Sequence, residues 1–212
     1  MSAPQSYYVP VDAGEAEFTE KRSHFLGHVR RVETEAEARA FLDEMRKKYY
    51  DARHNCWCYV LHEGGVVRYG DDGEPQGTAG QPMLNVFQRE GVENVVCVVT
   101  RYFGGVLLGA GGLTRAYAKS AKDALDAAGK ARMRLWSAVT VDCPYPMLER
   151  LKLLAAAHGG TVEGTDFGAA VSVRILLPQE NAAGFDAALT ELSAGTMTAW
   201  REGERFLPGP RE

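Results

Sequence analysis

The spacing of apolar and polar residues predicts a first group of alternating strands and helices. Residues 23–32 alternate as a half-buried strand does, whereas residues 38–49 place apolar side chains at helical spacing. Thr34, followed three residues later by Glu37, forms a capping box at the start of that helix. Residues 1–16 show little periodicity and are expected to form a loose arm. The predicted elements, in the order β-β-α-β-β-α-β-α, are strands over 18–21, 23–32, 54–62, 66–69 and 94–100 and helices over 34–50, 82–89 and 113–128.

A second pattern begins near residue 137 and has a different order of elements. That order, β-α-β-β-α-β, is typical of ferredoxin-like domains. We therefore expect domains at 1–130 and 137–204, a basic linker over 131–136 and a tail over 205–212. The predicted elements are strands over 138–143, 161–165, 169–177 and 196–201 and helices over 147–158 and 181–193.

A glycine-rich loop between a strand and a helix carries the densest candidate chemistry. Glycines let backbone N–H groups approach a ligand closely, and a helix N-terminus adds partial positive charge, so this arrangement favours phosphate. The spacing matches neither G-x-G-x-x-G nor G-x-x-x-x-G-K-[ST], so close packing by the glycines beside a solvated helix face is the alternative interpretation. The candidate phosphate- or nucleic-acid-binding residues are Arg101, Gly104, Gly105, Gly111, Gly112, Thr114, Arg115, Lys119 and Lys122.

Cations recur on one face of the helix after this loop. Arg115, Lys119 and Lys122 stand at positions i, i+4 and i+7, opposite the apolar stripe. With Arg101 at the strand end, four cations gather near one loop and would neutralise about three or four phosphates. This predicts an affinity that falls steeply with salt. A polar corner over residues 20–24 separates the first two predicted strands.

An acidic loop precedes the glycine loop. Asp71, Asp72 and Glu74 are three carboxylates within four residues, which is a pattern that magnesium or acid–base chemistry can use. Carboxylates beside Gly73 and Pro75 also serve as turn formers and helix caps, and we predict no cofactor. Because an acidic loop repels phosphate, the acidic and basic stretches should face different ways or be bridged by a cation.

The cysteines predict a reduced core rather than a metal site. Cys56 and Cys58 alternate along a predicted strand, with His54 and His62 on the same face. Zinc uses such ligands, but the C-x-C spacing is unusual and no second pair of ligands follows. Cys97 and Cys143 lie in apolar strand-like runs, so we expect all four thiols to be buried and reduced.

The overall composition limits the possible partners. Hydrophobic residues make up 45% and charged residues 25% of the 212 residues, as in ordinary globular proteins. The formal net charge of −4 disfavours nucleic-acid binding by the whole surface, so any RNA contact requires a local basic patch. No apolar run approaches about 18 residues and the first residues lack a signal pattern, which predicts a cytoplasmic protein without a membrane partner.

Two long stretches resemble the signature of the IMPACT/YigZ family. They are YGDDGEPQGTAGQP at 69–82 and VTRYFGGVLLGAGGLTRAY at 99–117, and the resemblance extends over most of the chain. It implies an α+β fold whose N-terminal β/α domain is similar to the second domain of ribosomal protein S-five. In the bacterial members a C-terminal ferredoxin-like domain follows, similar to one in elongation factor G. The eukaryotic members regulate translation through the general amino-acid control pathway.

The resemblance and the glycine loop together lead to one leading function. We expect a cytoplasmic, translation-linked regulator that binds RNA, the ribosome or a translation-associated protein, without DNA sequence specificity. An enzyme acting on a small phosphorylated or acidic ligand is the alternative, although no nucleophile is paired with a base in the sequence. A third hypothesis is a protein-interaction module that uses Tyr102, Phe103 and the sheet of the second domain.

Overall fold

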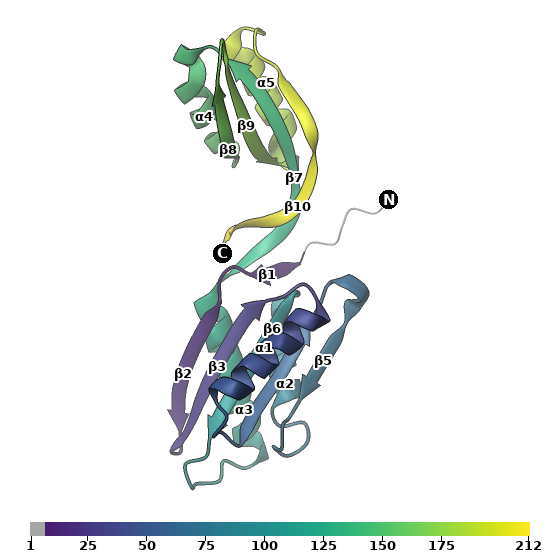
Figure 1. Cartoon of the computed structure of the whole chain (residues 1–212), viewed down its shortest axis with the longest axis vertical. Helices are drawn as coiled ribbons and strands as arrows, with labels where there is room; N and C mark the ends of the chain where they lie inside the picture. Colours follow the sequence, from purple (N-terminus) through teal and green to yellow (C-terminus); the bar gives the residue numbers. More distant parts are fainter. Residues whose placement is uncertain (1–6) are drawn as a thin grey trace. The chain divides into compact units, whose positions relative to one another are not determined.

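The structure, a computed structural model, describes residues 7–212 and contains two compact units (Figure 1). The first unit reaches to Met133 and includes Pro208–Glu212, and the second is Arg134–Leu207. Residues 1–6 of the expected arm lie outside the described residues. Among residues 7–212, none of the helices combines the length and the apolar run that crossing a membrane requires.

The first unit is built on an antiparallel sheet with strand order β2-β3-β6-β4-β5. Its order of elements from β2 to α3 confirms the predicted β-β-α-β-β-α-β-α. The short 3-10 helix Glu63–Gly65 lies in the hairpin between β4 and β5. The elements are β2 (Gly14–Glu20), β3 (Ser23–Arg31), α1 (Glu35–Lys48), β4 (His54–Val60), β5 (Val67–Gly70), α2 (Gly80–Glu90), β6 (Val95–Tyr102) and α3 (Ala110–Ala128).

Helices cover both faces of this sheet. Figure 1 shows α1 in front of the strands, where Phe41 and Met45 pack against Tyr59. On the opposite face, α2 and α3 bury a second core that includes Cys56 and Tyr117. Successive residues of β4 therefore alternate between two cores, as a strand buried on both faces requires. The four cysteines are free and buried, which confirms the predicted reduced core.

The segments expected as arm, linker and tail form strands. β1 (Tyr8–Pro10) pairs with the start of the long strand β7 (Lys130–Cys143). In β7, Ala131 and Met133 are buried between basic residues that are exposed or half-buried. The prediction of a linker over 131–136 is therefore wrong, because these residues alternate as part of a strand. Most of the expected tail belongs to β10 (Ala199–Arg211).

The second unit has the predicted β-α-β-β-α-β order. Its sheet follows the order β10-β7-β9-β8, and Leu151 of α4 and Phe185 of α5 are fully buried in its core with strand residues such as Val141. The α+β class and the ferredoxin-like order of elements are confirmed. The elements after β7 are a 3-10 turn (Tyr145–Met147), α4 (Leu148–Ala157), β8 (Thr161–Phe167), β9 (Val171–Pro178), α5 (Gln179–Ser193) and β10.

Candidate functional site

Two carboxylates of the acidic loop accept hydrogen bonds from backbone N–H groups of neighbouring elements. Asp71 Oδ1 accepts hydrogen bonds from the N–H groups of Ala79 and Gly80 at 3.1 and 2.8 Å, at the start of α2. Asp72 Oδ2 accepts a bond of 2.7 Å from the N–H of Asn55. Among the described residues, no group of three or more histidine, cysteine or acidic side chains is arranged to hold a metal. Asp71 therefore caps the start of α2, and Asp72 fixes the acidic loop to β4.

The third carboxylate forms a buried ion pair. Arg101 Nη1 donates to Glu74 Oε1 at 2.8 Å, and Tyr117 Oη donates to the same oxygen at 2.7 Å. Arg101 Nη2 also donates to Ser23 Oγ at 3.1 Å. Arg101 is a predicted phosphate-binding residue, and Glu74 is a carboxylate for which magnesium binding is one of the alternatives, but both side chains are buried and pair with each other. The acidic and basic stretches are thus bridged by a guanidinium group of the chain itself.

Two buried side chains near this pair, Cys56 and Tyr117, stay protonated. Burial is the main cause that raises the pKa of Tyr117 and of the Cys56 thiol above their usual values. Cys56 Sγ donates to the carbonyl oxygen of Asp71 at 2.9 Å, and His54 Nδ1 bonds the carbonyl of Asp72 at 2.9 Å. Each therefore bonds a backbone carbonyl of the acidic loop, and Cys56 lacks the thiolate character of a nucleophile.

The glycines of the loop have different roles. A Cβ at Gly104 would lie 2.0 Å from the carbonyl carbon of Arg22, and the Gly104 N–H donates to Ser23 Oγ at 3.3 Å. Gly104 therefore serves close packing against the β2–β3 turn rather than a ligand. Gly105 has φ of 82°, and a Cβ added there would meet no atom within 4 Å. Glycine is therefore favoured at this position by the left-handed backbone conformation and not by lack of space. Gly111 and Gly112 form the first turn of α3.

The cations of α3 separate into paired and unpaired groups. Lys122 is half-buried and lies between Asp126 at 2.5 Å and Glu90 at 3.6 Å. Lys119 pairs with Asp123 and remains exposed, while Thr114 and Arg115 are also exposed. Arg115 forms no ion pair with another described residue, and its Nη1 would be 3.5 Å from a Cβ at Gly111. Its guanidinium therefore lies over the first turn of α3.

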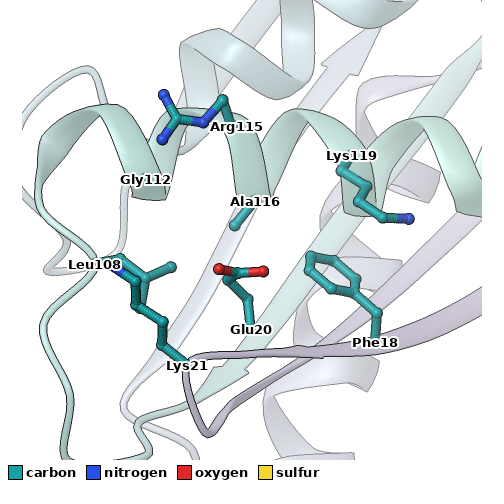
Figure 2. A pocket seen from close by; sticks show the side chains of 8 residues that line it. All are labelled: Phe18, Glu20, Lys21, Leu108, Gly112, Arg115, Ala116 and Lys119. Carbon is teal, nitrogen blue, oxygen red and sulfur yellow. The ribbon is translucent and has the colours of Figure 1, made fainter.

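A cavity of about 160 Å³ separates α3 from the end of the β2–β3 hairpin (Figure 2). Figure 2 shows the Glu20 carboxylate pointing toward Ala116 on α3, while Lys119 extends beside Phe18. The Lys119 ammonium lies 4.8 Å from the Phe18 ring centroid, as a cation–π contact. The lining residues are Phe18, Glu20, Lys21, Leu108, Gly112, Arg115, Ala116 and Lys119.

The hairpin contributes two cations that the sequence did not single out as site residues. Lys21 and Arg22 are the central residues of a two-residue turn between Glu20 and Ser23, and both are exposed. Their φ angles are 45° and 67°, in a region that glycine and asparagine normally occupy in such turns. Backbone strain of this kind is concentrated at functional sites. The polar corner over 20–24 was the signal in the sequence.

Comparison with known proteins places the chain in a family. The model described as "Impact N-terminal domain" matches residues 21–125, and "Domain of unknown function (DUF1949)" matches 141–196. "IMPACT family member YvyE" of Bacillus subtilis is 35% identical over 94% of this chain and 92% of its own length. The chain belongs to the IMPACT family. Family member YigZ of Escherichia coli is 34% identical, over 84% of this chain and 88% of YigZ.

Other known proteins match over different extents. A solved structure titled "Crystal structure of an hypothetical protein" is 32% identical, with a TM-score of 0.58 over 92% of this chain and 96% of that chain. "Protein IMPACT" of Rattus norvegicus is 32% identical over 51% of this chain and 35% of its own length. The bacterial relatives therefore share both domains of this IMPACT family member, and the rat protein matches about half of it.

Proposed function

We propose that this IMPACT family member is a cytoplasmic, translation-linked regulator that binds RNA phosphates, including those of the ribosome. The proposed surface is the hairpin–helix patch, which we define as Lys21, Arg22, Arg115 and Lys119. The observation that carries the proposal is that Lys21, Arg22 and Arg115 are exposed and form no ion pair within residues 7–212, on two elements that face one cavity. Arg101 and Gly104 are left out because protein groups occupy them, and Lys122 because it is half-buried between two carboxylates. Lys119 is kept because its ion-pair partner, Asp123, leaves it exposed.

The charge balance of this surface differs from that of the whole chain. The protein carries a formal charge of −4, yet three patch cations, Lys21, Arg115 and Lys119, line a cavity with one carboxylate, Glu20. Arg22 follows Lys21 in the turn. A cation that binds a phosphate releases the counterions of the RNA, which favours binding. Lys122 contributes less because it already pairs with Glu90 and Asp126. The start of α3 adds partial positive charge beside Arg115, since no side chain in the described chain caps this helix.

The competing hypotheses use the same loop differently. An enzyme acting on a small phosphorylated or acidic ligand would need free carboxylates at the glycine loop. Asp71 and Asp72 bond the backbone, and Glu74 is paired with Arg101, so the contacts favour binding over catalysis. A protein partner that docks elsewhere would not depend on the patch cations, so their removal separates the two proposals.

The test is binding of the purified protein to labelled RNA and to ribosomes. We expect the triple variant Lys21→Ala, Arg115→Ala, Lys119→Ala to lose at least about tenfold in affinity at low salt. The matched control removes three exposed cations of α1, on the other face of the sheet: Arg39→Ala, Arg46→Ala, Lys47→Ala. Equal losses in the two variants would contradict the proposal, because they would show a non-specific charge effect.

A further inference from the structure

A second cavity adjoins the patch on the other side of Leu108, which lines both. Its volume is about 340 Å³, within the range of about 300–1,000 Å³ usual for ligand pockets. Its walls are mostly apolar and include Phe103, Leu107 and Leu113, and Arg53 and His54 also line it. The two cavities thus place an apolar hollow next to a cationic one.

The apolar wall is formed by side chains that the fold leaves exposed. Phe103 is 45% exposed and Leu107 is 81% exposed, although both follow a strand whose residues are almost all buried. The Arg101 guanidinium carbon lies 5.4 Å from the Phe103 ring centroid, so a buried cation supports the ring. Exposed apolar side chains that line a cavity are typical of binding sites.

We propose that this second cavity receives one unpaired base of a single-stranded RNA, stacked on Phe103, while neighbouring phosphates contact the hairpin–helix patch. The inference rests on the proposed RNA binding and names its substrate class. Proteins that bind single strands combine a cationic track with aromatic side chains on which bases stack. In duplex RNA the bases are stacked inside the helix and cannot enter such a hollow.

Polar groups at the cavity fit the edge of a base. His54 Nδ1 lies 2.9 Å from the carbonyl oxygen of Asp72, which accepts only, so Nδ1 is the donor. In that tautomer Nε2 is the acceptor. Arg53 is exposed and forms no ion pair among the described residues, and its guanidinium offers only donors. The donors of Arg53 and the acceptor of His54, beside an aromatic face, suit a nucleobase better than an aliphatic side chain of a protein.

The experiment compares a labelled 12-nucleotide single-stranded RNA with the duplex of the same length. Fluorescence anisotropy of the labelled RNA is measured across a salt series with the full chain as wild type, Phe103→Leu and Phe103→Tyr. Leucine keeps apolar bulk and removes the aromatic face, whereas tyrosine keeps that face. Stacking is worth about 1–3 kcal/mol per base, so we expect Phe103→Leu to weaken single-strand binding about tenfold and Phe103→Tyr less than about twofold.

The salt dependence separates stacking from phosphate contacts. Stacking releases no counterions, so Phe103→Leu should keep the wild-type slope of log affinity against log salt. Arg115→Ala should instead reduce the magnitude of that slope by about 0.7. Wild-type preference for the duplex, or an unchanged affinity of Phe103→Leu, would overturn this inference and leave the proposed function standing. Absence of binding to both RNAs at low salt would instead overturn the proposed function, and the inference with it.

Discussion

Arg101 Nη1 lies 2.8 Å from Glu74 Oε1, and only 6% and 4% of the two side chains are exposed. Arg101 lies at the end of β6 and Glu74 lies in the acidic loop, 27 residues earlier in the chain, so the pair joins these two segments. Ser23 accepts hydrogen bonds from both Arg101 and Gly104, so the same network fixes the β2–β3 turn against the glycine loop. The buried pair therefore sets the position of the surface to which we assign phosphate binding.

Removing one partner of this pair should destabilise the fold strongly. Arg101→Ala leaves the Glu74 carboxylate buried without its cation, which we expect to cost about 3–5 kcal/mol of unfolding free energy. The double variant Arg101→Met, Glu74→Leu should lose less than the sum of the single changes, because no uncompensated charge remains. Urea denaturation of wild type, Arg101→Ala, Arg101→Met, Glu74→Leu and the double variant measures both effects. Additive losses would show that the two side chains do not interact as described.

Two adjacent glycines should respond differently to alanine. Gly104→Ala places a Cβ 2.0 Å from the Arg22 backbone, so we expect a loss of about 1–3 kcal/mol and a displaced hairpin. Gly105→Ala meets nothing within 4 Å and carries only the cost of a left-handed backbone, about 1 kcal/mol. Denaturation midpoints compare the two. A larger loss for Gly105→Ala would contradict the packing role of Gly104.

The carboxylate inside the cavity should oppose RNA binding. Glu20 points toward α3 between the cations of the patch, and no ion pair of its own appears among the described residues (Figure 2). Glu20→Gln removes the repulsion between this carboxylate and the RNA phosphates, so we expect it to raise RNA affinity roughly twofold at low salt. That change corresponds to less than about 1 kcal/mol, as expected for exposed charges. Glu63→Gln, which removes an exposed charge from the β4–β5 hairpin, is the control. Equal effects of the two changes would rule out a local role for Glu20.

His28 should make stability depend on pH. It is buried in β3, its Nε2 bonds Tyr49 Oη at 2.9 Å, and Glu15 lies 3.3 Å from Nδ1, with Lys48 nearby. Burial lowers its pKa below 6.5, outweighing the opposite effect of Glu15. The unfolded state then binds more protons, so this contribution is complete above about pH 6.5 and is lost as pH falls through the folded pKa.

The measurement for His28 is unfolding free energy at several pH values between about 7 and 5. Wild type should lose stability toward the acidic end of this range. His28→Asn, which does not titrate, should lose less over the same interval, even if it is less stable throughout. Parallel curves for the two proteins would contradict the role of His28.

The order of elements was predictable because apolar spacing reports which faces are buried. Apolar spacing predicted the order of elements in both domains, but it missed the strand over residues 131–136, which we interpreted as a linker although their alternation suits a strand. The start of β7 pairs with β1, which lies more than a hundred residues away in the sequence. Long-range pairing of this kind leaves a weak local signal.

The candidate site was predictable only in part. The glycine loop and Arg115 followed from local spacing, and the partner of Lys122, four residues later, was also visible in the sequence. The partner of Arg101 was not, because the ion pair depends on how the acidic loop folds back onto β6. The turn cations Lys21 and Arg22 join the site only through tertiary contact with the glycine loop.

The most direct test of the central claim is the salt dependence of single-stranded RNA binding. For about three or four phosphate contacts, we predict a slope of log affinity against log salt of about −2 to −3. Lys21→Ala, Arg115→Ala and Lys119→Ala should each reduce its magnitude by about 0.7, while the α1 control variant keeps the wild-type slope. A slope near zero in wild type, or slopes that the patch substitutions leave unchanged, would contradict phosphate binding at the hairpin–helix patch.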